Sequence, residues 1–163
     1  MMIEAQKKIS SRIKAGGVVA VLATSTVGGF EGIRQYAYPD PASGGRPWTI
    51  CYGETHDVHP GDHKSITECK ELLRYRLGVE AEGLDKCITR VTTDGQAVAF
   101  LSLAHNIGVG GVCRSSVAKD FNKGNARQAC NDLLKFDKAA GITFPGLTRR
   151  RVAERRLCLE GVE

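Results

Sequence analysis

The sequence is short of three features, and each shortage excludes a class of protein. Aromatic residues make up only 6% of the 163 residues, and Trp48 is the single tryptophan. Because binding to nucleic-acid bases needs a platform of aromatic side chains, we expect no nucleic-acid partner. No two cysteines form a Cys-x-x-Cys pair, which argues against a zinc knuckle. No internal repeat or linker divides the chain, so its length favours one domain.

The charge and the cysteines limit the partners and the compartment. The chain has 23 Lys and Arg against 18 Asp and Glu, a net charge of +5. A basic surface favours polyanions such as nucleic acid, anionic lipid or the bacterial cell wall. Six cysteines are compatible with up to three disulfides in an oxidising compartment, and the alternative is buried thiols in the cytosol. The pairing stays open among Cys51, Cys69, Cys87, Cys113, Cys130 and Cys158.

The amino-terminal segment has the layout of an export signal. Residues 1–14 carry four basic side chains, and residues 15–30 carry no charge. This uncharged run has 16 residues, four of them glycine, whereas a stable membrane span needs about 20 strongly apolar residues. It is therefore a marginal anchor, and the alternative is a buried helix of the folded domain. The two interpretations are compatible, because a segment that leaves a bilayer must pack somewhere. We divide the chain into a basic flank plus weak anchor, residues 1–30, and a domain, residues 31–163.

The residue pattern predicts an α+β fold that is mainly helical. Ser-x-x-Glu at 65–68 begins a long helix, and Thr-x-x-Gln at 93–96 begins a buried core helix that glycines 108, 110 and 111 end. Residues 34–52 predict a β-hairpin or a three-stranded meander. We expect a small β lobe and a larger helical lobe joined by the long helix. Shorter helices are predicted over 114–121, 125–136 and 147–159.

Glu31 and Asp40 are candidates for acid–base chemistry. Cleavage of a glycosidic bond requires one carboxyl group to protonate the leaving oxygen and a second to activate water. Phe30 and Ile33 surround Glu31 with apolar groups that favour its protonated form, whereas Asp40 lies between two prolines in a turn. Thr49 follows on a predicted strand, where its hydroxyl can hold a water. Spacing alone does not distinguish this set from ordinary surface carboxylates.

Six stretches of the chain carry a more specific signal. They are Phe30-Glu31-Gly32, Tyr38-Pro39-Asp40, Trp48-Thr49-Ile50-Cys51-Tyr52-Gly53, Thr67-Glu68-Cys69-Lys70-Glu71-Leu72-Leu73, Ala104-His105-Asn106-Ile107-Gly108 and Gly146-Leu147-Thr148-Arg149-Arg150-Arg151. Over residues 28–163 this series resembles the phage lysozymes, or endolysins, of glycoside hydrolase family 24. The resemblance implies a lysozyme-like fold and hydrolysis of the β-1,4 bond between N-acetylmuramic acid and N-acetylglucosamine in peptidoglycan.

The resemblance also implies roles for individual residues. Glu31 is expected to be the general acid, Asp40 the base that orients or activates water, and Thr49 the residue that positions this water, with inversion at the anomeric carbon. Arg149 is expected to pair with Glu31, and this cation would oppose the apolar effect on the Glu31 proton. Asn106 is expected to reach the substrate. A monomer that needs no metal and no cofactor is expected.

The amino-terminal segment resembles the signal-anchor-release segments of some members of this family. Such proteins are exported to the periplasm without cleavage, tethered to the inner membrane and then released. Some relatives carry cysteine at the position of Asp40 and are controlled by thiol exchange, but residues 1–50 contain no cysteine. We therefore predict control by refolding, in which residues 15–30 pack against the domain and bring Glu31 into place.

Two departures from the family pattern bear on Asp40. Eight residues separate Asp40 from Thr49, where the family has five, and the extra residues fall in Ser43-Gly44-Gly45-Arg46. They are expected to lengthen a turn without moving the strand. Glu54 replaces a histidine that usually follows the Thr strand, which puts a second acidic group near the site and leaves the role of Asp40 open.

Two further clusters are interpreted as surface features. The histidines and aspartates of residues 56–63 contain Pro-Gly and are expected to form a solvated loop and not a zinc site. The arginines of residues 149–156, apart from Arg149, are expected on a solvated helix face.

Two rival functions stay open. The rival enzyme is a lytic transglycosylase, which would use Glu31 alone and release a 1,6-anhydro sugar. The other rival is a membrane-anchored wall-binding protein without activity.

Overall fold

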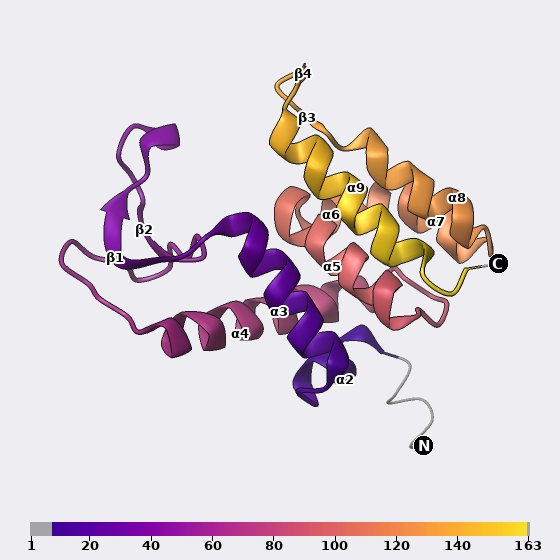
Figure 1. The fold of residues 1–163 in the computed structure, drawn as a ribbon, viewed down its shortest axis with the longest axis horizontal. Helices are drawn as coiled ribbons and strands as arrows, with labels where there is room; N and C mark the ends of the chain where they lie inside the picture. The colour runs from indigo at the N-terminus through magenta and orange to yellow at the C-terminus, as the bar shows by residue number, and fades with distance from the viewer. Residues whose placement is uncertain (1–7, 163) are drawn as a thin grey trace.

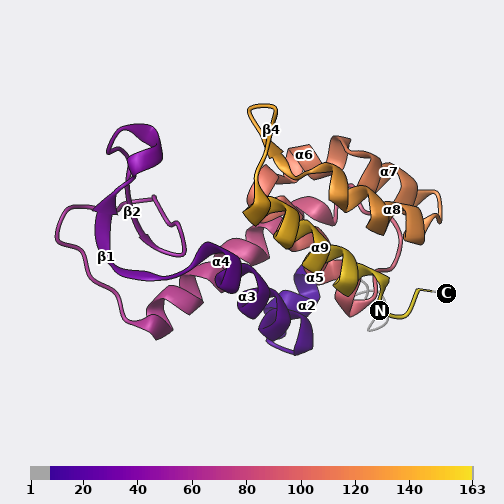
Figure 2. The ribbon, with the colours of Figure 1, turned by 45° about the horizontal axis from the view of Figure 1, so that its top comes forward.

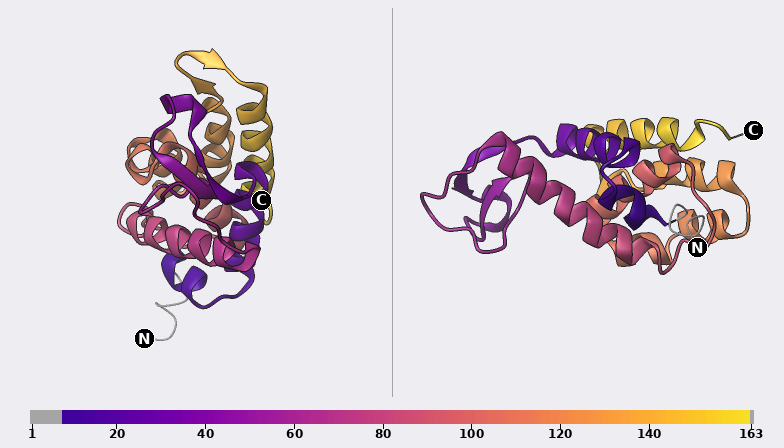
Figure 3. Two further views of the ribbon diagram at one scale, coloured as in Figure 1. Left: turned by 90° about the vertical axis from the view of Figure 1, so that its left-hand side faces the viewer. Right: turned by 90° about the horizontal axis from the view of Figure 1, so that it is seen from below.

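Two helices connect a small β lobe to a larger helical lobe (Figure 1). The computed structural model describes residues 8–162. Helix α3 (Val18–Glu31) leads into the β lobe, and helix α4 (Ile66–Leu84) leads back from it. Figure 3 shows α4 running from the β lobe along the helical lobe. The predicted architecture of two lobes joined by a long helix is confirmed.

The β lobe is built on one antiparallel hairpin. Strand β1 (Arg34–Pro39) pairs with β2 (Trp48–Cys51), so that Tyr38 lies opposite Thr49 and Pro39 opposite Trp48. The turn between the strands contains a short 3-10 helix, η1 (Pro41–Ser43). The predicted hairpin is thus correct, and among the described residues the alternative third strand is reduced to isolated bridges.

Helix α4 and helix α5 (Asp94–Ile107) begin where the sequence predicts. The Ser65 hydroxyl accepts the Glu68 N–H at 3.1 Å, and the Glu68 carboxylate accepts the Ser65 N–H at 2.6 Å. Thr93 and Gln96 make the same reciprocal pair at the start of α5. Each reciprocal pair is a capping box, which satisfies backbone N–H donors that a helix otherwise leaves unpaired in its first turn. It therefore fixes the start of the helix.

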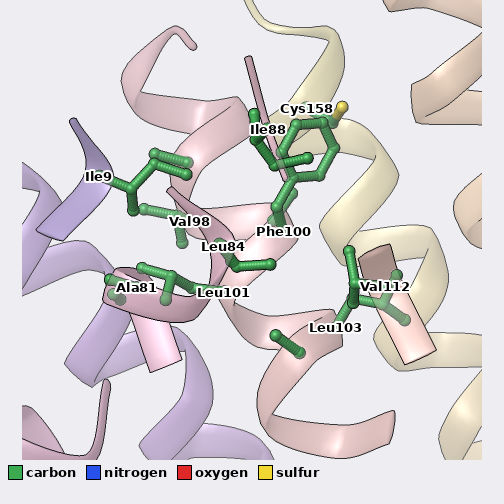
Figure 4. Close-up of a cluster of buried hydrophobic side chains, with 14 of the residues drawn as sticks. Ile9, Ala81, Leu84, Ile88, Val98, Phe100, Leu101, Leu103, Val112 and Cys158 are labelled. Atoms are coloured by element: carbon green, nitrogen blue, oxygen red, sulfur yellow. The ribbon is translucent and has the colours of Figure 1, made fainter. Parts of the chain in front are cut away.

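Helix α5 is the centre of the helical lobe. Residues 95–104 are all buried, as the nearly continuous apolar sequence predicts. Figure 4 shows Phe100, Leu101 and Leu103 of this helix among side chains from several other elements. Helix α9 (Pro145–Leu159) lies beside α5 (Figure 2). The two helices approach so closely at Gly95 that a Cβ atom there would overlap the Leu157 carbonyl oxygen.

The remaining elements cover the core. They are α6 (Val109–Arg114), α7 (Ser116–Asn122), α8 (Ala126–Asp132), η2 (Leu133–Lys135), β3 (Lys138–Ala139) and β4 (Ile142–Thr143). They include three that the sequence did not predict, namely helix α6 and strands β3 and β4. Gly108, with φ of +88°, does end α5, but Gly110 and Gly111 lie inside α6 and do not act as stops. The hairpin β3–β4 has only two residues in each strand, which is too short for a periodic signal.

The described part of the amino-terminal segment, from residue 8 onward, packs against the helical lobe. Helix α2 (Ile9–Lys14) precedes α3, which passes without a break through the predicted boundary at residues 30 and 31. Val19, Ala23 and Val27 of α3 are buried in the core, whereas Val18, Val21 and Leu22 are exposed. Within residues 8–162, no helix is long and apolar enough to cross a membrane.

All six cysteines are paired, and the prediction of up to three disulfides is confirmed. Cys51–Cys69 joins β2 to α4, Cys87–Cys113 joins the segment after α4 to α6, and Cys130–Cys158 joins α8 to α9. One bond therefore attaches the β hairpin to the long helix, and the other two lie within the helical lobe.

Candidate active site

Glu31 lies at the junction of the two lobes. It is the last residue of α3, and Gly32, with φ of +71°, turns the chain toward β1. The Glu31 side chain retains 27% of its accessible surface, and its Oε1 accepts the Arg150 Nη1 at 2.6 Å. A partly exposed carboxyl group is thus held in place by a buried cation.

The predicted partner of Glu31 is wrong by one residue. Arg150 makes the ion pair, and Arg149 is exposed, lining a groove with Thr26 and Val152. Successive residues of a helix point about 100° apart, so only one of two neighbouring arginines can face Glu31. The motif Arg149-Arg150-Arg151 supplies the cation, but the packing of α9 decides which arginine it is.

Behind Arg150 lies a buried charge network that the sequence did not predict. Arg150 Nε donates to Glu154 Oε1 at 3.2 Å, and Arg151 Nη2 donates to the same oxygen at 2.7 Å. The Ser102 hydroxyl donates to it at 2.5 Å. Arg150, Arg151 and Glu154 are all buried, so the expectation of a solvated arginine face fails for two of the arginines. The i,i+4 and i,i+3 spacing of these opposite charges was a signal of their pairing.

The network shifts the proton equilibria of Glu154 and Arg151. Burial raises the pKa of the Glu154 carboxyl, and the charge of Arg151, the Ser102 hydroxyl and the charge of Arg150 oppose this shift. Burial also lowers the pKa of Arg151, and Glu154 opposes that shift. Asn106 closes the chain of contacts, because its Oδ1 accepts from Arg151 Nη1 at 2.9 Å. Asn106 therefore contacts the charge network that holds the cation facing Glu31.

Asp40 and Thr49 meet at one backbone carbonyl of the β lobe. The Asp40 N–H and the Thr49 hydroxyl both donate to the Pro47 oxygen, each at 3.4 Å. Thr49 is buried, whereas Asp40 is partly exposed. The Asp40 carboxylate accepts the Ser43 hydroxyl at 2.7 Å. The hairpin thus brings the second carboxylate and the threonine together, on the lobe opposite to the cation that holds Glu31.

The lengthened loop is closed on itself. Gly45 donates its N–H to the backbone carbonyl oxygen of Asp40 at 2.7 Å. The Ser43 hydroxyl also bonds the backbone carbonyl oxygen of Arg46. Gly44 and Gly45 have φ of +76° and +95°, a conformation that favours glycine. The extra residues are accommodated inside this turn, and Tyr38 still pairs with Thr49 across the hairpin.

Glu54 is tied to its own turn. Its Oε1 accepts the N–H groups of Thr55 and His56, both at 2.8 Å, and its backbone pairs with Ile50. The carboxylate therefore satisfies local backbone donors of its own turn.

The histidine-rich segment is an exposed loop. His59 donates its N–H to Asp62 at 2.8 Å and has Asp57 within ion-pair distance, while the His63 ring lies 4.4 Å from the Tyr36 ring. Among residues 8–162, no group of three or more His, Cys, Asp or Glu side chains is arranged to hold a metal ion.

Comparison with known proteins identifies the family of the chain. A sequence model of the phage lysozyme family matches residues 28–154. The chain belongs to the phage lysozyme family. It is therefore a glycoside hydrolase of the lysozyme class, with bacterial peptidoglycan as its substrate, as the sequence motifs imply.

Individual relatives agree with this placement. The chain is 31% identical to the SAR-endolysin of Enterobacteria phage P21 over 161 residues, which covers 96% of both proteins. It is 36% identical to the endolysin of Bacillus phage B103 over 133 residues, which covers 81% of this chain but only half of that relative. The match to B103 therefore concerns one part of a longer protein.

One similar protein has solved structures of two forms, an active and a secreted inactive one. The active form of the P1 phage endolysin Lyz superimposes with a TM-score of 0.75, at 26% identity, over 90% of this chain and 96% of that one. The secreted inactive form gives a TM-score of 0.51, at 24% identity, over 66% and 77%. The arrangement of elements described here is thus closer to that of the active form.

Proposed function

We propose that the chain is an endolysin in which Glu31 protonates the glycosidic oxygen between N-acetylmuramic acid and N-acetylglucosamine. The observation that carries the proposal is the ion pair at the lobe junction, where buried Arg150 holds the partly exposed Glu31 carboxyl at 2.6 Å. A general acid must be both fixed in direction and open to substrate, and Glu31 meets both conditions.

Asp40 and Thr49 are assigned to the water. Asp40 takes a proton from a water molecule while that water attacks the anomeric carbon, and the Glu31 proton passes to the leaving oxygen. The Thr49 hydroxyl and the Asp40 N–H share the Pro47 carbonyl, so the two residues keep a fixed relation to each other. Attack from the face opposite to the leaving group inverts the anomeric configuration.

A wall-clearing assay tests the role of Glu31. Glu31→Gln keeps the shape of the side chain but removes the transferable proton, and the clearing rate is expected to fall about a thousandfold. Glu71→Gln, the same change at an exposed position of α4, is the matched control and is expected to clear walls like the parent. Clearing at the parent rate by a folded Glu31→Gln variant would sink the proposal.

The two rival functions give other results. A wall-binding protein without activity would show no clearing even as the parent chain. A lytic transglycosylase would clear walls, would not need Asp40, and would release 1,6-anhydro sugars. Mass spectrometry of the products and the rate of Asp40→Asn separate hydrolase from transglycosylase.

The proposal extends to export and release. The chain would reach the periplasm tethered through residues 15–30 and then leave the inner membrane, acting as a monomer. Support comes from the name of the P21 relative, a SAR-endolysin that the chain matches over 96% of both proteins. Further support comes from the basic flank, because Arg12 bonds the Thr92 and Thr93 carbonyls and pairs with Asp94. The helical lobe thus has ready partners for the flank once the segment is released.

Cell fractionation tests the release. Ser25 and Gly29 of α3 are exposed, and Gly29 has open space around it, so leucine at both positions makes the segment more apolar without disturbing the core. Gly28 is unsuitable, because a Cβ there would lie 3.2 Å from the Tyr52 ring. The double leucine variant is expected in the membrane fraction with slow clearing. Ser25→Gln with Gly29→Gln is the size-matched control, expected to be released, and equal distribution of both variants would contradict the idea.

A further inference from the structure

Each of the three nitrogens of the Arg150 guanidinium donates a hydrogen bond. Nη1 bonds Glu31 Oε1 at 2.6 Å, Nη2 bonds the Ser102 carbonyl oxygen at 3.0 Å, and Nε bonds Glu154 Oε1 at 3.2 Å. The Arg150 side chain is 6% exposed and the Glu154 side chain is fully buried. One edge of the cation therefore faces Glu31, and the other edge is held from inside the helical lobe.

Glu154 is an unusual group to find at this place. A buried carboxylate is costly unless it is paired, and hydrophobic residues of similar size often stabilise a core as well. Its Oε1 accepts from three side chains, those of Arg150, Arg151 and Ser102. Such a closely bonded group restricts Arg150 far more than a surface ion pair would, and it adds a negative charge directly behind the cation that faces Glu31.

We propose that Glu154 is a positioning residue for the cleavage reaction, one that fixes Arg150 against Glu31 and sets the pH range in which Glu31 keeps its proton. This inference rests on the proposed role of Glu31 as the general acid. Glu154 touches no substrate in this scheme. It acts only through the direction and the effective charge of the Arg150 guanidinium.

The charges in contact determine the sign of the effect. Within residues 8–162, the ionisable groups in direct contact in this chain of bonds are Glu31 on α3 and Arg150, Arg151 and Glu154 on α9. Helix α5 contributes Ser102 and Asn106, which do not titrate, and Phe136 contributes a carbonyl oxygen. Loss of the Glu154 charge removes the carboxylate that Arg150 and Arg151 share, so this chain of bonds becomes more positive by one charge. A more positive surrounding favours the ionised form of a carboxyl group, so clearing is expected to decline at a lower pH than in the parent.

Three variants test this inference in the full-length protein. Glu154→Gln keeps a bonding oxygen but removes the negative charge, and it is expected to move the alkaline limb of the pH–clearing profile about one pH unit lower. Arg151→Gln removes a positive charge, and it is expected to move the limb in the opposite direction. Glu154→Gln combined with Arg151→Gln restores the local charge and is expected to return the limb close to that of the parent.

The control is Glu160→Gln, the same chemical change at the exposed carboxyl-terminal end of α9. It is expected to leave the limb unmoved. A purely structural role for Glu154 would lower clearing equally at every pH, and a folded Glu154→Gln variant with the parent limb overturns the inference. If Glu154→Gln does not fold, an unmoved limb in Arg151→Gln overturns it instead.

A measurement without activity separates this inference from the proposed function. The Glu31 side-chain carboxyl carbon can be followed by NMR titration, with Glu31→Gln giving the assignment. The titration midpoint is expected to shift in the same direction as the limb in each variant. Active Glu31→Gln protein would defeat the proposed function itself, whereas inactive Glu31→Gln with unmoved midpoints in the other variants would defeat only the role of Glu154.

Discussion

The two lobes hold their parts of the active site by different means. On the helical side, Glu31 depends on Arg150, whose position is set by the buried contacts between α9 and α5. On the β side, Asp40 and Thr49 depend on backbone bonds within one hairpin, which Cys51–Cys69 attaches to α4. The helical part of the site should therefore fail only when the core fails, and the β part can fail by itself.

The largest effect is expected at Arg150. Arg150→Gln leaves Glu154 and Glu31 without their shared cation, and breaking a buried ion pair costs about 3–5 kcal/mol of unfolding free energy. Arg149→Gln is the matched control, since Arg149 is exposed, and it should change stability by about 0.5 kcal/mol or less. Urea unfolding and wall clearing of both variants make the comparison. Equal losses of unfolding free energy and of clearing in Arg150→Gln and Arg149→Gln would show that the buried network does not hold the site.

The second prediction concerns the packing of α5 against α9. Gly95→Ala forces a Cβ onto the Leu157 carbonyl oxygen, and the expected loss of unfolding free energy is about 3 kcal/mol. Gly29→Ala, in open space on α3, should be neutral or stabilising by up to about 1 kcal/mol. In a thermal melt, Gly95→Ala should lose activity and helix content together. Activity lost well before the helices unfold would argue that core and site are independent.

The third prediction concerns the β side. Cys51→Ser with Cys69→Ser opens a loop of 18 residues, for which chain entropy gives about 3 kcal/mol. The loss should fall on the hairpin, so clearing and amide protection in β1 and β2 decline while the helical lobe stays protected. Cys130→Ser with Cys158→Ser, which removes the bond between α8 and α9, should instead lower the stability of the helical lobe. Hydrogen exchange that declines uniformly in both variants would erase the distinction between the lobes.

The smallest effect is an acid sensitivity of the helical lobe. Burial of Asp132 by itself would raise its pKa, but hydrogen bonds from Ser116, Lys135 and Gln128 outweigh it and lower the pKa to about 2. Because this is below the ordinary value of 3.8, the group stabilises the fold above about pH 4, and this contribution disappears as the pH falls toward 2. It amounts to about 2 kcal/mol. Asp132→Asn should be less stable than the parent at pH 7 and similar to it near pH 2, and a constant difference would contradict the assignment.

Sequence and structure agree best where the signal is local. The capping residues Ser65 and Thr93 predict the starts of α4 and α5, because a cap depends on neighbours three residues away. The hairpin of Asp40 and Thr49 follows from alternating strand residues and a glycine turn. The family motifs also point to Glu31, whose place at the end of α3 depends on the adjacent Gly32.

The sequence was insufficient where distant helices decide the environment. The inward face of α9 consists of Arg150, Arg151, Glu154 and Cys158, a helical stripe that is mostly charged. A pattern of apolar residues does not reveal such a stripe, so the sequence predicts a solvated face there and points to Arg149 in place of Arg150. The disulfide pairs were open for the same reason, since Cys130 and Cys158 meet only when α8 packs on α9.

We propose that Glu31 and Asp40 hydrolyse a β-linked glycan with water that attacks from the face opposite to the leaving group. The most direct measurement is proton NMR of peptidoglycan fragments during digestion, which records the first anomer of the new reducing sugar before it equilibrates. Inversion predicts that the α anomer appears first. A β anomer would indicate retention and a 1,6-anhydro product would indicate transglycosylation, and either product would refute the proposed inverting hydrolysis.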